Sequence, residues 1–295
     1  MENTDSIKKL VQEKYTEIAE QSDKANQASC CGATNCSTEV YNIMTDDYTA
    51  LEGYNQDADL GLGCGLPTAF AQIEKGDTVI DLGSGAGNDC FIARHETGEE
   101  GKVIGIDFTP AMIRKARENA AKLEYNNVEF RQGDIEEMPA LDNEADVIVS
   151  NCVLNLVPNK KAVISEIFRV LKPGGHFSIS DIVLQGALPD AILKDVEMYA
   201  GCVAGAIQME EYMQLIEDAG FEQVTIQKQK TIEVPDDILS RYLDRNALDA
   251  FKASGTGIFS ITVFAAKPGS TPKTEKRKVK IAETLACCEP GSGCC

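Results

Sequence analysis

From residue 77 onward, short apolar segments alternate with stretches whose apolar residues recur every three or four positions. The first pattern is typical of buried strands and the second of amphipathic helices. Their alternation indicates a parallel sheet with helices on both faces, so we predict a doubly wound α/β domain. The predicted strands are DTVIDL, KVIGID, NVEFRQ, ADVIVSN and GHFSISDIV, and the predicted helices begin near Asn88 or span residues 109–123 and 160–171.

The flanking regions follow other patterns. Apolar residues at helical spacing predict a helix over residues 6–20, and a polar, cysteine-bearing loop follows it. Beyond residue 186 we predict helices over 189–204 and 208–219 and strands FEQVTIQKQ and GIFSITVFAAK, as a smaller α+β region. The expected organisation is an N-terminal segment (1–72), a Rossmann-like domain (73–185), a C-terminal α+β domain (186–268) and a disordered cysteine-rich tail (269–295).

Local rules set two helix boundaries. Thr109 is expected to cap a helix that has Pro110 at its first position. The sequence KPGG at 172–175 is expected to end the preceding helix.

Charge limits the partners. The chain has 295 residues with 28 Lys and Arg against 47 Asp and Glu, a formal net charge of −19, so a phosphate backbone or an anionic membrane would be repelled. We therefore expect no nucleic-acid or membrane partner. The polar start of the chain predicts a cytoplasmic protein, in which the 11 cysteines stay mostly as thiols.

A glycine-rich turn, GSGAGND, follows the first strand of the α/β pattern. Asp81 stands just ahead of the turn, where its charge would disfavour a pyrophosphate and favour a cationic ligand such as S-adenosyl-L-methionine. Asp107 ends the second strand, where a carboxylate can accept both ribose hydroxyls, and Asp134 follows the third, where one can accept the adenine amine. Over residues 73–185 this order resembles the class I methyltransferases, which implies a cofactor site of Asp81, Gly83, Ser84, Gly85, Gly87, Asp107, Phe108, Met112, Asp134, Ile135 and Asn151.

Thiols are the candidate acceptor groups. The chain has two histidines, His95 and His176, and both are expected to be structural. Cys152, Cys202 and Cys64 lie in SNCVLNL, AGCVAGA and GLGCGLP, and three converging thiolates would suit a thiophilic ion. Each of them alone could instead be a buried free cysteine, the commoner fate of that residue and the expectation for Cys90.

The segments DLGSGAGND, SNCVLNLVPNKKAVISEIFRVLKPGG, AGCVAGA and GCGLP together resemble the arsenite methyltransferases over residues 1–265. The resemblance implies that Cys152 and Cys202 hold trivalent arsenic and that Cys64 takes part in ligation. It also implies a fourth cysteine after the first helix, matched by Cys30. The chain departs from the family in having Tyr15-Thr16 where the pattern has Tyr-Gly, and it offers Cys31 and Cys36 as alternatives to Cys30.

The chemistry that the resemblance implies needs no general base, because thiolate-bound trivalent arsenic keeps a lone pair. Methyl transfer oxidises arsenic by two electrons, and a disulfide between Cys64 and Cys30 would return them. The glycines around Cys64 are expected to let its turn move between these roles. The implied substrate is arsenite or its glutathione conjugate, the implied reductant is thioredoxin or glutathione, and no tightly bound metal is expected.

Two other functions stay open at the level of sequence. A class I methyltransferase for a small organic acceptor would share the cofactor site and be indifferent to Cys152. A thiol-based metalloid-binding protein would use the cysteines without consuming the cofactor. The tail cysteines could form a metalloid-scavenging arm or a disordered end that binds adventitiously; they are Cys287, Cys288, Cys294 and Cys295.

Overall fold

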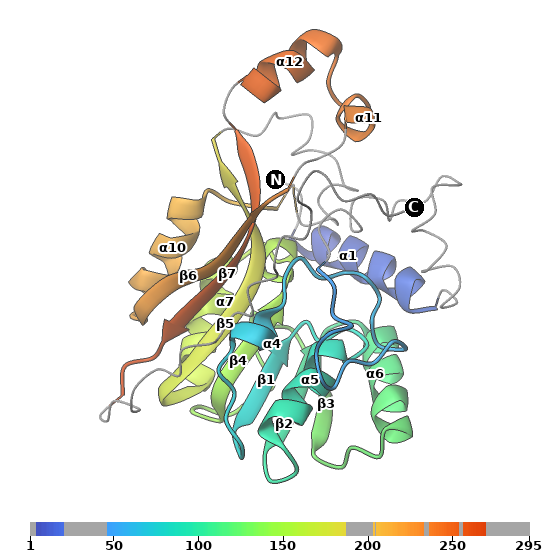
Figure 1. Ribbon diagram of the computed structural model, residues 1–295, viewed down its shortest axis with the longest axis vertical. Coiled ribbons are helices and arrows are strands. Elements are labelled where there is room, and N and C mark those ends of the chain that lie inside the picture. The colour runs from blue at the N-terminus through green and yellow to red at the C-terminus, as the bar shows by residue number, and fades with distance from the viewer. Residues whose placement is uncertain are drawn as a thin grey trace, which may run out of the picture.

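The computed structural model describes residues 4–20, 46–186, 203, 205–232, 236–253 and 256–269. Its centre is a seven-stranded sheet in the order β3-β2-β1-β4-β5-β7-β6, which runs across the middle of Figure 1. The strands are β1 (Thr78–Leu82), β2 (Lys102–Asp107), β3 (Val128–Gln132), β4 (Ala145–Asn151), β5 (Leu171–Gln185), β6 (Glu222–Thr231) and β7 (Gly257–Ala266).

Five strands of the sheet are parallel, as predicted: β1 pairs with β2 and β4, β2 with β3, and β4 with β5. Their carboxyl ends therefore lie at one edge of the sheet. Strand order reverses between β1 and β4, and such a switch point is where open α/β sheets bind ligands.

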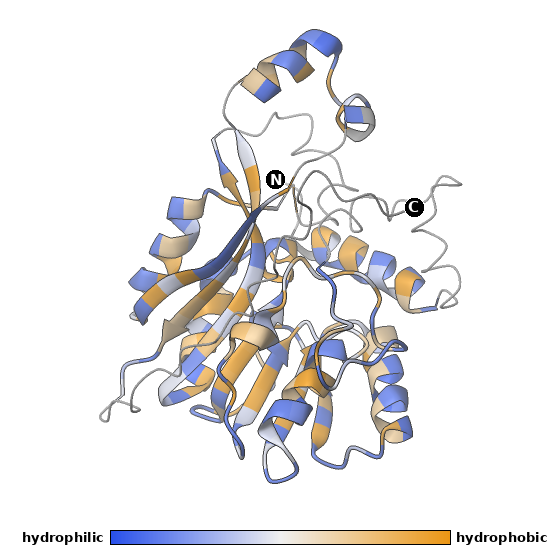
Figure 2. Cartoon of the chain, viewed as in Figure 1, coloured by the Kyte–Doolittle hydropathy of each residue, from blue (hydrophilic) through white to orange (hydrophobic). Residues whose placement is uncertain are grey.

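The C-terminal strands continue this sheet. The sequence predicts a smaller domain over 186–268, but β7 pairs antiparallel with β5 along its whole length, from His176↔Ala266 to Gln185↔Gly257, and β6 pairs with β7. The predicted boundary at residue 185 therefore does not divide the sheet, because β5 runs on to Gln185 and offers β7 a long apolar partner. At the outer edge, β6 is mainly hydrophilic, which suits a strand with one unpaired side (Figure 2).

Helices cover both faces of the sheet, which confirms the doubly wound prediction. On one face α5 and α6 pack on valines of β1, β2 and β4, and on the other face α7 and α10 pack on isoleucines of the same strands and on β5. The helices are α1 (Thr4–Glu20), α4 (Pro67–Phe70), α5 (Asn88–Thr97), α6 (Pro110–Lys122), α7 (Lys160–Val170), α10 (Met209–Asp218), α11 (Asp236–Leu239) and α12 (Arg245–Ala253).

The two predicted helix boundaries fall close to their expected places. Thr109 occupies the N-cap of α6 with Pro110 following it, but its side chain makes no capping hydrogen bond. Helix α7 ends at Val170, and residues 171–175 already belong to β5. The predicted helix over 189–204 lies almost wholly outside the described residues, as does the tail from residue 270.

A third apolar cluster lies at the carboxyl edge of the sheet. It joins Val11 of α1, Leu239 of α11 and Leu248 of α12 to Cys64 and Cys152. In Figure 1, α1 lies over this edge beside α6, and α11 and α12 lie beyond the ends of β6 and β7. Elements far apart in the sequence therefore enclose the two cysteines. Within the described part of the chain, no helix combines the length and the apolar character that crossing a membrane requires.

Candidate functional site

A cleft opens at the carboxyl ends of β1, β2 and β4, at the switch point of the sheet. Its empty volume, which includes space open to solvent, is about 1080 Å³. Its lining combines the glycine-rich turn and Asp107 with Asn151 and Cys152. The predicted cofactor residues in its lining are Asp81, Gly83, Ser84, Gly85, Asp107, Phe108, Asp134, Ile135 and Asn151.

The glycine-rich turn has the backbone that only glycine adopts easily. Gly83, Gly85 and Gly87 have φ values of +68°, +51° and +100°. A methyl group on Gly83 would lie 2.4 Å from Val153 Cγ2, whereas one on Gly85 would meet nothing within 4 Å. Gly83 therefore permits close packing, and the space beside Gly85 is open. The buried hydroxyl of Ser84, between them, has no hydrogen-bond partner among the residues that the structure describes.

Two buried carboxylates frame the turn. Burial raises the pKa of Asp81, and the negative charge of Asp89 raises it further. Burial also raises the pKa of Asp107, against the effect of the Thr109 and Gly85 amides, which donate to it at 2.8 and 3.0 Å. Because a cation would relieve the mutual repulsion of these carboxylates, the cleft suits a positively charged ligand.

A third carboxylate, Asp89, was not predicted from the sequence. It lies in the first turn of α5 and is held by Tyr48 Oη at 2.9 Å, Thr68 Oγ1 at 3.3 Å and Asn151 Nδ2 at 3.4 Å. Burial raises its pKa to about 6 although these donors oppose the shift. Its position after a glycine turn, at a helix N-terminus, is a usable sequence signal, because that end of a helix favours anions. Tyr48 carries no comparable signal.

Helix α1 closes one side of the cleft. Lys8 Nζ donates to Asp134 Oδ2 at 2.6 Å and to the Glu136 carboxylate, and Gln12 Nε2 donates to the Phe108 carbonyl at 3.1 Å. Lys8 and Gln12 were not predicted as site residues. The predicted residues Gly87 and Met112 do not line the cleft: Gly87 packs against Phe91 and Phe130, and Met112 is fully buried in α6.

These residues fit S-adenosyl-L-methionine. The carboxylates can accept hydrogen bonds from its ammonium and ribose hydroxyls and oppose its positive charge. Ser84 offers an unused buried hydroxyl, and the open space at Gly85 admits a ligand close to the backbone. The carboxylates and the Ser84 hydroxyl together therefore match a cationic nucleoside without phosphate.

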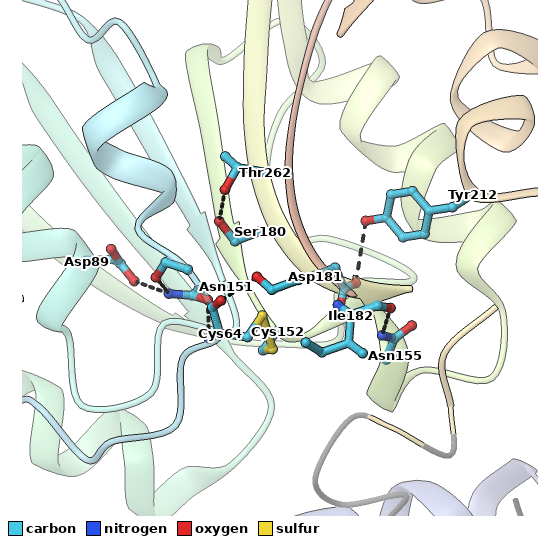
Figure 3. The surroundings of a disulfide bond; sticks show 12 residues. Cys64, Asp89, Asn151, Cys152, Asn155, Ser180, Asp181, Ile182, Tyr212 and Thr262 are labelled. Carbon is cyan, nitrogen blue, oxygen red and sulfur yellow. Dashed lines mark hydrogen bonds between the residues drawn. A yellow bond between two sulfur atoms is a disulfide. The ribbon is translucent and has the colours of Figure 1, made fainter. Parts of the chain in front are cut away.

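Two cysteines meet beside the cleft, and one of them, Cys152, belongs to its lining. Cys64 and Cys152 form a disulfide with their Cα atoms 5.8 Å apart, although a cytoplasmic protein was expected to keep them as thiols (Figure 3). The predicted redox pair was Cys64 with Cys30, but the pair in this structure is Cys64 with Cys152. Cys30, with its alternatives Cys31 and Cys36, and Cys202 lie outside the described residues.

The turn that carries Cys64 is tightly packed, in contrast to the predicted mobility. Cys64 is fully buried, and a methyl group on Gly63 would lie 2.6 Å from Asn151 Nδ2. One on Gly65 would lie 2.5 Å from Ser180 Oγ. These two glycines are therefore required by close approach to neighbouring side chains. Only Gly61, of the three, has a left-handed φ, of +66°.

Cys90 and the two histidines make contacts that stabilise the fold and lie outside the cleft lining. Cys90 is a buried free thiol, as predicted, and its Sγ donates to Asp81 Oδ2 at 3.3 Å. His176 is buried with Nε2 2.6 Å from the Ala71 carbonyl, and His95 pairs with Glu52 at the surface. Among the residues that the structure describes, no three His, Cys, Asp or Glu side chains gather in a way that could hold a metal ion.

Comparison with known proteins agrees with this geometry. The family described as "Methyltransferase domain" matches residues 73–220. The arsenite methyltransferase of Halobacterium salinarum is 40% identical over 90% of this chain and 67% of its own, and that of Homo sapiens is 32% identical over 73% and 58%. Among solved structures, an arsenic(III) S-adenosylmethionine methyltransferase from Chlamydomonas reinhardtii superposes with a TM-score of 0.61 at 29% identity, covering 82% of this chain and 77% of its own.

Proposed function

Because this chain belongs to the arsenite methyltransferases, a family of S-adenosylmethionine-dependent enzymes, we propose that it transfers methyl groups from S-adenosylmethionine to trivalent arsenic bound by its own cysteine thiolates. One observation carries the proposal: Cys152, bonded to Cys64, lines the same cleft as Asp81 and the glycine-rich turn. A soft ligand site and a cofactor site therefore share one cavity.

The cofactor would supply an electrophilic methyl group on its sulfonium. Asp107 lines the cleft and would accept the ribose hydroxyls, because each of its oxygens keeps acceptor capacity beside the hydrogen bond from the Gly85 or Thr109 amide. Asp81 and Asp89 would oppose the cationic charge. Asp134 would accept the adenine amine, and for this its contact with Lys8 must be shared or broken.

The thiols would bind the substrate and return electrons to it. Thiolates of Cys152 and Cys202 would hold trivalent arsenic, whose lone pair would form the bond to the methyl group, so that arsenic is formally oxidised by two electrons. The Cys64 thiolate would then attack the Cys152 sulfur: the Cys64–Cys152 bond forms, the bond between Cys152 and arsenic breaks, and its electron pair stays on arsenic and restores the trivalent state. The structure would then correspond to the enzyme after this step, and thioredoxin or glutathione would reduce the disulfide through thiol exchange. We place this cycle in the cytoplasm, where these reductants are present.

The test is turnover with labelled cofactor, arsenite, glutathione and a thioredoxin system. Cys152→Ser should abolish methylated arsenic while calorimetry shows unchanged cofactor affinity, and Cys90→Ser, a buried thiol outside the pair, should retain activity. Turnover by the Cys152 variant at the wild-type rate would contradict the proposal. Cofactor consumption that does not require arsenite would indicate an organic acceptor instead, and arsenite binding without cofactor consumption would indicate a metalloid-binding protein.

A further inference from the structure

Side chains from three separate elements bind the main chain of the Cys64 turn, residues 63–67. Several of its main-chain polar groups bond to side chains of β4, β5 and β7 and to Tyr48, while the Leu66 carbonyl accepts from the Ala69 amide. The Ser178 hydroxyl of β5 donates to the Pro67 carbonyl at 2.9 Å, and Tyr48 Oη donates to the Gly65 carbonyl at 3.1 Å. The position of Cys64 is therefore set from outside the turn.

Asn151 makes the most specific of these contacts. Its Oδ1 accepts from the Cys64 amide at 3.0 Å, and its Nδ2 donates to the Gly65 carbonyl at 2.8 Å. One planar side chain thus holds both ends of the Cys64–Gly65 segment. Asn151 also precedes Cys152 in the chain, so it links the main chains of the two bonded cysteines (Figure 3).

Ser260 supplies the contact that is most distant in sequence. Its hydroxyl donates to the Cys64 carbonyl, 196 residues away, and Ser260 itself is buried in β7 between β5 and β6. It does not line the cofactor cleft. Its side chain therefore contacts the cysteine pair through the Cys64 main chain and not through the cofactor cleft.

Cys152 is fixed in a matching way. Its amide donates to the Ser180 carbonyl of β5 at 2.8 Å, and its φ of +59° is a left-handed conformation that few residues other than glycine adopt. The same strand, β5, thus binds the Cys152 amide and supports the Cys64 turn, because Ser180 Oγ is what a methyl group on Gly65 would strike.

We propose that Asn151 and Ser260 are positioning residues for the Cys64–Cys152 pair: they fix the Cys64 main chain so that its sulfur stays within bonding reach of Cys152 in the reduced protein. Fewer conformations of the dithiol then have to be given up when the bond closes, so the effective concentration of one thiol at the other is high. This deepens the proposed function, because that function uses the same pair. It can be tested without arsenite or cofactor.

The measurement is the equilibrium of the pair with glutathione in the full-length protein. In this reaction the thiols of Cys64 and Cys152 react with one molecule of glutathione disulfide to give the protein disulfide and two molecules of glutathione. The protein loses two electrons and glutathione disulfide gains them. The two protons of the protein thiols pass to the released glutathione thiolates. The oxidised fraction of this pair is read by trapping with an alkylating reagent and mass spectrometry of the peptides that contain Cys64 and Cys152.

Ser260→Ala should lower the equilibrium constant about three- to tenfold, because without this contact the Cys64 main chain of the reduced protein has more conformations to give up when the bond closes. A tenfold fall is a shift of about 30 mV. The matched control is Thr97→Val, which removes a buried hydroxyl that donates to the Asp77 carbonyl at 2.7 Å, at the other end of β1. The control should leave the constant unchanged even where both variants melt at a lower temperature.

Two more variants complete the test. Ser260→Thr keeps the hydroxyl and should restore the constant to within twofold of the wild type. Asn151→Ala removes two hydrogen bonds and should lower the constant tenfold or more. If Ser260→Ala does not fold, the Asn151 variant alone tests the proposal. The proposal is wrong if the Ala variants stay within twofold of the wild type, if Thr97→Val shifts the constant equally, or if Ser260→Thr stays as low as Ser260→Ala. A failure of arsenite methylation alone would leave this result untouched.

Discussion

A buried acid next to the disulfide gives a prediction about stability and pH. Asp181 of β5 is fully buried, and burial raises its pKa from 3.8 to about 7, although Lys160, the Ile182 amide and the Tyr212 hydroxyl oppose the shift. The amide donates at 2.9 Å and the hydroxyl at 3.4 Å (Figure 3). The folded protein therefore keeps a proton that the unfolded chain has already lost at neutral pH.

The sign and size of the effect follow from linkage. The contribution of Asp181 to stability is fully present below pH 3.8 and is lost as the pH rises toward 7. Each pH unit in that interval lowers the free energy of unfolding by about 1.4 kcal/mol, so the whole interval of about 3 units amounts to roughly 4 kcal/mol. Above pH 7 both states are ionised and the loss levels off.

Asp181→Asn removes the titration and keeps the shape. The new side-chain oxygen can accept from the Ile182 amide, and the new NH₂ group can donate to the Tyr212 hydroxyl. The wild type should lose stability between pH 5 and 7 while the variant does not. We therefore expect the variant's free energy of unfolding to gain on that of the wild type by about 1.4 kcal/mol per pH unit in this interval, and the difference to level off above pH 7. Urea unfolding at pH 5, 6, 7 and 8 measures this difference.

Asp249→Asn is the control, because Asp249 is exposed on α12. Its difference from the wild type should stay within about 0.5 kcal/mol at each pH. If the Asp181 variant differs from the wild type by the same amount at all four pH values, or gains on it only as the pH falls, the assignment of a retained proton to Asp181 is refuted.

Three further predictions concern the cleft and the disulfide. Gly83→Ala should abolish cofactor binding in calorimetry, because a methyl group on Gly83 would lie 2.4 Å from Val153 in the cleft wall. Gly76→Ala is the control and should retain binding, because a methyl group there would meet nothing within 4 Å. Equal affinities of the two variants would contradict this. Asp107→Asn should weaken cofactor binding about tenfold or more through loss of charge-assisted hydrogen bonds, and titration of the cofactor checks it. Reducing the disulfide, which spans 88 residues, should lower the free energy of unfolding by about 4 kcal/mol in urea, and a variant with both cysteines replaced by serine should not respond to the reductant.

The hydrophobic pattern was sufficient for the parallel half of the fold, because there most strands are followed by a helix that packs on the sheet, as β1 is by α5 and β2 by α6. Strands such as Thr78–Leu82 and helices such as Lys160–Val170 fall where the pattern places them. The pattern could not show that residues 257–266 join the same sheet, since pairing of β7 with β5 is a contact between segments about 80 residues apart. Helices α11 and α12 were not predicted, because α11 is short and both lie in a region where the rhythm is weak.

The site was predictable to the extent that it follows strand ends. Asp81 and Asp107 lie at the carboxyl ends of two adjacent buried strands, so topology alone brings them together. The contacts that hold Cys64 depend on Asn151, Tyr48 and Ser260, which meet only after the whole sheet has formed. For the same reason the glycines around Cys64 suggested mobility in the sequence, whereas the structure explains Gly63 and Gly65 by packing.

The contact between the Ser260 hydroxyl and the Cys64 carbonyl also has a consequence for biosynthesis. The ribosome makes Cys64 196 residues before Ser260, so during that part of translation the cysteine turn has no β7 to rest on. The nascent chain would expose this thiol without its final neighbours until β7 enters the sheet. Insertion of that strand would thus mark the moment at which a newly made molecule acquires its reactive centre.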